Sequence, residues 1–103
     1  MDKLALLTEI LTQSPTDAFA RYGLAMEHVY RGNPETAIAE FSTLIAHSPD
    51  YVPAYQMSAQ TLAKLGRTGE AITRLKEGLT AAQSINNAHA ANEMQTLLDD
   101  LRA

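Results

Sequence analysis

The sequence predicts an all-α chain, an α-solenoid of about six antiparallel helices. Three observations lead to this fold class. No segment alternates polar and apolar residues with period two, whereas apolar residues recur at helical spacing from end to end. Residues 32–38 (GNPETAI) are echoed 34 positions later by residues 66–72 (GRTGEAI). A period of that length is typical of a helix–turn–helix repeat, which buries its apolar stripe only by stacking on its neighbours.

The first two predicted helices are separated by the Ser14-Pro15 pair. The first covers the N-terminal segment, with an apolar stripe at Leu4, Leu7, Ile10 and Leu11. The second runs from about residue 16 to residue 30, with apolar residues on overlapping faces at Phe19, Tyr22, Met26, Val29 and Tyr30. Gly32 ends it, because glycine adopts the left-handed conformation at little steric cost.

The third predicted helix begins at Asn33-Pro34-Glu35. Asparagine can cap a helix, proline suits its first position, and glutamate is favoured near the positive end of the helix dipole. Its buried stripe is expected at Ile38, Phe41, Leu44 and Ile45. Residues 48–50 (SPD) end it.

Three more helices follow. The fourth spans about 52–65 and ends at Gly66, and the fifth starts at Thr68, which we expect to act as its cap. The fifth carries a stripe at Ile72, Leu75 and Leu79. The sixth, from about residue 86 to residue 101, has its stripe at Met94, Leu97, Leu98 and Leu101. Because every connection is short, neighbouring helices are expected to be antiparallel.

Composition and charge restrict the classes of function. At 103 residues and 46% apolar content, the chain is long enough for one domain with a modest core. The net charge is -4 and the basic residues are scattered, which disfavours nucleic acid because a phosphate backbone needs a basic face. Glu9 interrupts the N-terminal apolar run, and no segment reaches the roughly 20 apolar residues of a membrane span. We therefore expect a cytoplasmic protein with no nucleic-acid or membrane partner.

No residue pattern indicates catalysis, a metal or a cofactor. The chain has no cysteine, and its histidines, His28, His47 and His89, are not spaced as a metal-binding pair. His89 and Glu93 lie one helical turn apart, and we interpret them as an exposed hydrogen-bonded pair. His28 is interpreted as a partly buried packing residue. We expect a protein that is not an enzyme and that has no catalytic, cofactor-binding or metal-binding residues.

Several residue types recur in both copies of the period. A small residue lies in the middle of the first helix, glycine at the turn, alanine early in the second helix, and a large apolar residue four places later. These positions are Ala25 and Ala59, Gly32 and Gly66, Ala37 and Ala71, and Phe41 and Leu75, with Pro49 closing the first copy. In these residues the chain resembles the tetratricopeptide repeat (TPR) proteins of a small bacterial type. The resemblance implies a single domain, 1–103, with a half repeat at 1–15, repeats at 18–51 and 52–85, and a capping helix at 86–103.

Four positions depart from the TPR pattern. Arg21 replaces a large aromatic residue that Tyr55 keeps, and Ser58 stands where Leu24 stands in the first repeat. Gly78 replaces the usual alanine at a cost of about 0.5–1 kcal/mol in a helix, so we expect close packing there. The terminal proline of the second repeat is absent, which predicts a longer fifth helix.

The resemblance implies a concave groove lined by the first helix of each repeat. The implied groove residues are Phe19, Tyr22, Met26, Val29, Tyr30, Gln56, Met57, Gln60, Ala63 and Lys64, with Gly23 beside them. We expect a non-catalytic scaffold for protein–protein interaction, whose groove receives a peptide or a helix. Phe19, Tyr22 and Met26 would anchor apolar groups, and Gln56 and Gln60 would hydrogen-bond backbone groups.

Some TPR proteins hold acidic C-terminal tails with Lys, Asn and Arg side chains, but the corresponding positions here are Tyr22, Met26, Met57, Asn87 and Ala91, and we expect no such capture.

Two questions stay open from the sequence. The final helix could instead fill the groove. The alternative function is self-association as a homodimer, with Leu4 and Leu7 at one end or Leu97 and Leu101 at the other covering a second copy.

Overall fold

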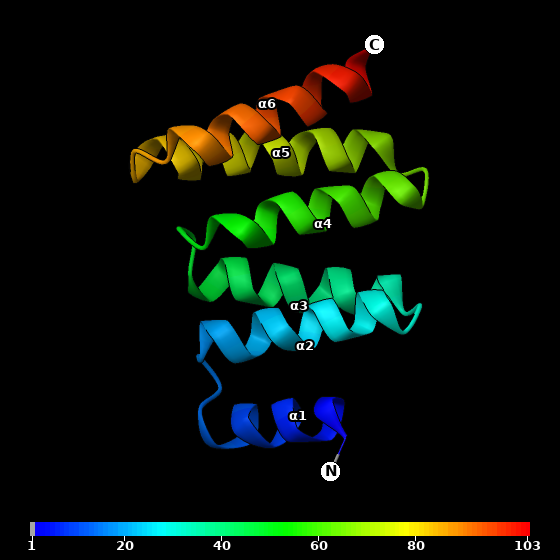
Figure 1. The fold of residues 1–103 in the computed structure, drawn as a ribbon, viewed down its shortest axis with the longest axis vertical. Helices are drawn as coiled ribbons and strands as arrows, with labels where there is room; N and C mark the ends of the chain where they lie inside the picture. The colour runs from blue at the N-terminus through cyan, green and yellow to red at the C-terminus, as the bar shows by residue number, and fades with distance from the viewer. Residues whose placement is uncertain (1) are drawn as a thin grey trace.

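The computed structural model describes residues 2–103, which form six helices. They are α1 (Lys3–Gln13), α2 (Ala18–Tyr30), α3 (Pro34–His47), α4 (Val52–Lys64), α5 (Thr68–Ser84) and α6 (Ala88–Arg102). No strand occurs among the described residues, so the all-α prediction is confirmed. Figure 1 shows the helices stacked along the long axis of a 43 × 29 × 18 Å molecule, with the two termini at opposite ends.

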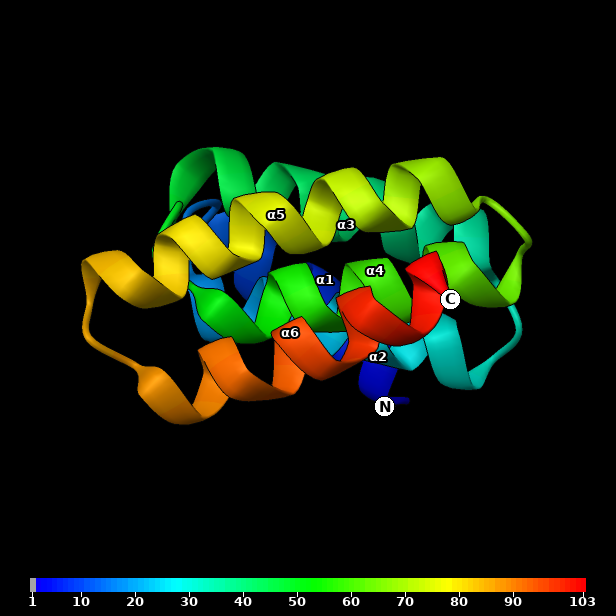
Figure 2. The ribbon, with the colours of Figure 1, turned by 90° about the horizontal axis from the view of Figure 1, so that it is seen from above.

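The helices are arranged in layers. Helices α2, α4 and α6 form one layer, and α3 and α5 form a second layer behind it (Figures 1 and 2). Each helix packs chiefly against the helices before and after it in the chain, and α6 also contacts α4. Helix α6 therefore continues the first layer beside α4 and extends the predicted helical solenoid by one element.

The turns between the helices explain where each helix begins. Gly32 and Gly66 have positive φ angles of 76° and 78°. The first value confirms the predicted left-handed stop, and Gly66 adopts the same conformation at the predicted end of the fourth helix. The Asp17 carboxylate accepts a hydrogen bond from the Ala20 backbone N–H at 3.0 Å, so α2 begins two residues later than predicted. Likewise Asn87 accepts from the Ala90 N–H at 3.1 Å and fixes the start of α6.

Two expected caps are not formed. Thr68 is the first residue of α5, and Arg67 occupies the cap position before it, so the prediction of Thr68 as a cap is wrong. The physical reason is the short turn after Gly66: the Arg67 carbonyl already accepts the first helical hydrogen bond, from the Ala71 N–H at 3.0 Å. Asn33 does lie at the cap position of α3, but its side chain makes no capping hydrogen bond.

The core lies where neighbouring helices meet. Its largest fully buried side chains are Phe41, Leu44, Leu75, Met94 and Ser58. Ala25 and Ala59, the small residues of the repeat pattern, are completely buried. Helix α5 extends over 17 residues, as the missing proline predicted. Among the helices of residues 2–103, none combines the length and the apolar content of a membrane span.

Candidate binding face on helices α2, α4 and α6

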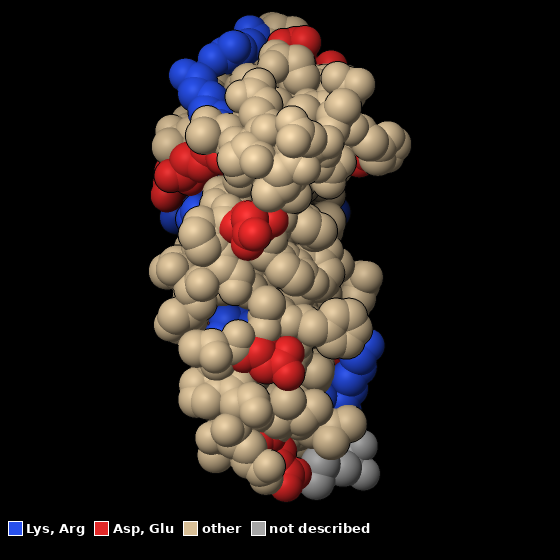
Figure 3. Space-filling view, turned by 90° about the vertical axis from the view of Figure 1, so that its left-hand side faces the viewer, with Lys and Arg blue, Asp and Glu red and all other residues tan. Residues whose placement is uncertain are grey.

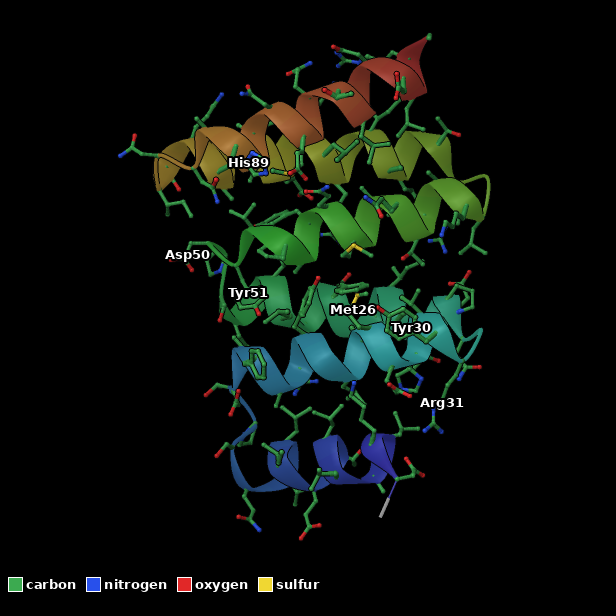
Figure 4. The ribbon with its side chains drawn as sticks, in the orientation of Figure 1. Met26, Tyr30, Arg31, Asp50, Tyr51 and His89 are labelled. Atoms are coloured by element: carbon green, nitrogen blue, oxygen red, sulfur yellow. The ribbon has the colours of Figure 1, made fainter. Side chains whose placement is uncertain are left out.

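The most exposed aromatic side chains of the chain lie on α2. Phe19 is 81% exposed and Tyr30 is 73% exposed, although both are large and apolar. They are three helical turns apart on the same side of α2, or roughly 16 Å at 1.5 Å per residue. Met26 lies between them on that side, and Figure 4 shows Met26 and Tyr30 together on the near surface of the helix.

The residues between these two aromatic side chains are half-buried and rest on the core. Tyr22, Met26, Val29 and Met57 all pack against the buried cluster that contains Phe41 and Leu44. The Tyr22 ring centre is 6.0 Å from that of Phe41 and 5.4 Å from that of Tyr51. These predicted groove residues therefore belong partly to the core and partly to the surface.

Tyr51 is a member of this aromatic group that the sequence reasoning missed. It lies in the connection between α3 and α4, outside the helical stripes on which the groove prediction was based. Burial raises the pKa of the Tyr22 phenol above its ordinary value of 10.0, and the nearby Tyr51 and Tyr30 phenols raise it further. The aromatic group is therefore uncharged at neutral pH.

Helix α4 contributes amide side chains and one cation. Gln56, Gln60 and Ala63 are half-buried, and Lys64 is exposed. The Gln56 Nε2 atom donates to a Glu93 carboxylate oxygen on α6 at 3.1 Å. By contrast, the Gln60 side chain makes no hydrogen bond to another part of residues 2–103, and its amide is available to a ligand.

Helix α6 adds a third set of residues to this surface. Glu93 also pairs with His89 at 2.5 Å, and His89 is 87% exposed, which confirms the predicted hydrogen-bonded pair. Asp100 follows Glu93 by two helical turns, on the same side of the helix. The polar spacing of residues 89, 93 and 100 was a signal for this surface, but none of these residues was among the predicted groove residues.

We call this surface the α2/α4/α6 face. It consists of Phe19, Tyr22, Met26, Tyr30, Tyr51, Gln56, Gln60, Lys64, His89, Glu93 and Asp100. Gly23 is not part of it, because a Cβ atom on Gly23 would lie 3.3 Å from Leu7 of α1. Three surface hollows of about 470, 510 and 580 Å³ are lined by other residues. These three hollows therefore lie outside the α2/α4/α6 face.

His28 is half-buried, with its Nδ1 atom 3.5 Å from the Asn33 amide nitrogen, as expected for a packing residue. Within residues 2–103, no three metal-binding side chains gather at one point. On the side of the molecule shown in Figure 3, acidic and basic side chains are spread over its length and do not gather into one patch of a single sign.

A two-layer stack of antiparallel helix pairs with a 34-residue period and an open face on one layer defines a helical-repeat protein. Residues 28–98 match the tetratricopeptide repeat family, and the chain belongs to that family. TPR domains generally serve as non-catalytic modules of protein interaction. No protein of curated function matches this chain in sequence.

Solved structures share the fold. A tetratricopeptide repeat domain protein from Salinibacter ruber is 32% identical, with a TM-score of 0.80, and the match covers 84% of this chain and 88% of that one. The TPR2B domain of yeast Sti1, solved in a complex with pHsp70, has a TM-score of 0.88 at 23% identity, covering 96% and 79% of the two chains. The translocator chaperone SycD of Yersinia enterocolitica has a TM-score of 0.86 at 14% identity, covering 96% and 69%.

Proposed function

We propose that this protein is a non-catalytic interaction module that binds a peptide segment of a partner protein across the α2/α4/α6 face. The observation that carries the proposal is the exposure of Phe19 and Tyr30, 81% and 73%, at the two ends of one apolar strip. Exposed aromatic side chains of this size are typical anchors of protein interfaces, because burial by a partner removes a large apolar area from water.

Each part of the face has a role in this proposal. Phe19 and Tyr30 supply the apolar anchors, and the half-buried Tyr22 and Met26 form the floor between them. The Gln60 amide pairs with the backbone of the bound segment, as in other sites that recognise extended peptides. The complex of yeast Sti1 TPR2B with pHsp70 supports a protein partner for this fold.

The same geometry argues against a partner recognised by its terminal carboxylate. At the positions that would hold such a group stand Tyr22, Met26, Met57, Asn87 and Ala91. None is a cation, and the Asn87 side chain already caps α6. A carboxylate there would lose hydration without gaining an ionic partner.

The proposal is tested with a variant that keeps the fold. Because Tyr22 and Met26 contribute to the core, substitutions there could unfold the protein, whereas Phe19→Glu/Tyr30→Glu alters only exposed side chains. The variant and the wild type are compared by affinity capture from the native lysate, after circular dichroism has shown equal helicity. We expect a partner retained by the wild type and lost with the variant. Identical captured proteins would contradict the proposal.

A charge-matched control comes from α1. Leu6 and Ile10 are 48% and 37% exposed at the far end of the stack, so Leu6→Glu/Ile10→Glu changes the same number of exposed apolar side chains and the same charge. This control should capture the partner as the wild type does.

Self-association is the second candidate function, and the exposure of α1 favours it. Leu4 and Leu7 pack against α2, while Leu97 and Leu101 pack against the core beneath α6. Leu6 and Ile10 are left on the outer side of α1, one helical turn apart, and in an antiparallel α1–α1 pair each would meet the other. Light scattering over a concentration series tests this: the wild type should form dimers and Leu6→Glu/Ile10→Glu should not. A monomer at high micromolar concentration would exclude it.

We also propose the repeat division 1–15, 18–51, 52–85 and 86–103, in which α6 acts as the cap. It is supported by two equivalent hydrogen bonds. The Arg21 guanidinium donates to the Pro15 carbonyl at 3.0 Å, and the Tyr55 hydroxyl, one period later, donates to the Pro49 carbonyl at 2.5 Å.

A further inference from the structure

We infer that the segment bound by the α2/α4/α6 face is basic, with a lysine or arginine that lies beside an aromatic or large aliphatic residue. This inference rests on the proposed function and adds the chemistry of the partner. It places the basic residue at one end of the face, where α2, α4 and α6 begin. We call this region the acidic end, and it consists of Phe19, Tyr22, Tyr51, Asp17, Asp50 and Glu93.

The aromatic part of the acidic end is already assembled. The rings of Tyr22 and Tyr51 are 5.4 Å apart, and Phe19 is exposed one turn before Tyr22 on α2. In Figure 4, Tyr51 and His89 lie toward the same end of the helices, one above the other. A segment that crosses the layer here therefore passes from aromatic rings on α2 to the His89–Glu93 pair on α6.

Three carboxylates lie at the same end of the layer as these rings. Asp17 lies close to Tyr51. Burial is the main cause that raises the pKa of the Tyr51 phenol, and the negative charge of Asp17 raises it further. Asp50 precedes Tyr51 and is exposed at the same end of the molecule (Figure 4). The Glu93 carboxylate reaches toward α4, where it accepts the Gln56 hydrogen bond, and its side chain is 46% exposed.

The neighbouring arginine is not available to neutralise these carboxylates, and His89 pairs with Glu93 alone. Arg21 is the arginine nearest to them on α2, but its guanidinium pairs with Glu40 of α3 at 2.9 Å and with the Pro15 carbonyl. Lys64 is at the opposite end of α4. Carboxylates beside exposed aromatic faces favour lysine or arginine in two ways, by charge and by cation–π contact.

The helix starts at this end do not offer an alternative site for an anion. The Asp17 and Asn87 side chains already accept hydrogen bonds from the first turns of α2 and α6. In α4, Pro53 removes one of the free N–H donors. The potential of the acidic end is therefore set by its carboxylates and selects a basic segment.

The test uses a phage-displayed library of random twelve-residue peptides selected on the wild-type protein, followed by fluorescence anisotropy with the most enriched peptide. We expect enriched peptides to combine an aromatic residue with lysine or arginine. The neutralised variant Asp17→Asn/Asp50→Asn/Glu93→Gln should bind that peptide about tenfold more weakly, with a smaller salt dependence. Asparagine can still cap α2, so the fold is retained.

A matched control neutralises three exposed carboxylates outside the α2/α4/α6 face, Glu9→Gln/Glu77→Gln/Asp99→Asn, and should bind as the wild type does. Enrichment of acidic or uncharged peptides, or equal affinity for the neutralised variant, would overturn the inference. If Phe19→Glu/Tyr30→Glu loses peptide binding but the neutralised variant binds as the wild type does, the inferred basic preference is wrong and the proposed function stands. If both variants bind the peptide as the wild type does, the proposed function is wrong as well.

Discussion

Gly78 of α5 lies directly against Tyr55 of α4: a Cβ atom on the glycine would be 2.7 Å from the Tyr55 Cβ atom. The same added atom would be 2.6 Å from the Met94 sulfur of α6. Three helices therefore meet at a point where there is no room for a methyl group. This close approach explains the glycine in the middle of α5. The cost of glycine within a helix had led us to expect close packing at this position.

The first prediction concerns this contact. Gly78→Ala should lower the free energy of unfolding, because overpacking costs about 1–3 kcal/mol and exceeds the helical gain of about 0.5–1 kcal/mol. Gly69→Ala, also in α5 but with open space around the added atom, should leave stability unchanged or slightly higher. Urea unfolding of both variants measures the difference. If Gly78→Ala proved as stable as Gly69→Ala, the contact would not be as tight as described.

The second prediction concerns the buried hydroxyl of Ser58. This side chain is completely buried in α4, and its hydroxyl has no hydrogen-bond partner within the described chain. Ser58→Ala should therefore raise the free energy of unfolding by about 1 kcal/mol, because it removes an unsatisfied polar group. The control is Thr61→Val, whose lost hydroxyl donates to the Met57 carbonyl at 2.7 Å, and this change should give no such gain. A destabilised Ser58→Ala protein would count against the prediction.

The third prediction concerns the ion pair of Arg21 and Glu40. Their side chains are only 15% and 20% exposed, and two hydrogen bonds of 2.9 and 3.2 Å join them. A double-mutant cycle with Arg21→Met and Glu40→Gln should give a coupling energy of about 1 kcal/mol. The more exposed pair of Arg67 and Glu35 should couple more weakly in the same assay. Equal coupling in the two cycles would show that burial does not strengthen the first pair.

The fourth prediction concerns alkaline stability. Burial raises the pKa values of Tyr22, Tyr51 and Tyr55 above 10.0 in the folded state. Unfolded tyrosines lose their protons at a lower pH than these do, so the stabilising contribution is complete below pH 10 and is lost as the pH rises through the folded-state pKa values. As the pH is raised from about 9 to about 11, the thermal midpoint of the wild type should fall, and that of Tyr22→Phe should fall less steeply. If the midpoint of Tyr22→Phe fell as steeply with pH as that of the wild type, Tyr22 would not contribute to the loss of stability at high pH.

Much of the fold was predictable because it depends on local signals. The period, the two glycine turns and the helical stripes indicated six helices in order, and the missing proline indicated a long α5. The caps were less predictable, because capping depends on backbone geometry in turns of one or two residues. Thr68 does not cap α5, because the first helical hydrogen bond is already accepted by the carbonyl of Arg67, one residue earlier.

The candidate face was predicted in part. The TPR resemblance placed the α2 and α4 residues on one surface, but it gave no indication that Phe19 and Tyr30 are exposed while Tyr22 and Met26 pack into the core. Tyr51 and Glu93 were missed because they join the face through tertiary packing, from a loop and from the last helix. The Arg21–Glu40 pair was missed for the same reason: it joins adjacent helices at positions that no single-helix pattern connects.

The central claim is that the α2/α4/α6 face binds the partner. The most direct measurement is an NMR titration of the isotope-labelled wild-type protein with the most enriched displayed peptide, followed by backbone amide shifts. The account predicts that the shifts concentrate on α2, α4 and α6 and in the turn at Tyr51, and that α1 and the outer side of α3 and α5 stay unchanged. Shifts confined to α1, or to the outer side of α3 and α5, would contradict it.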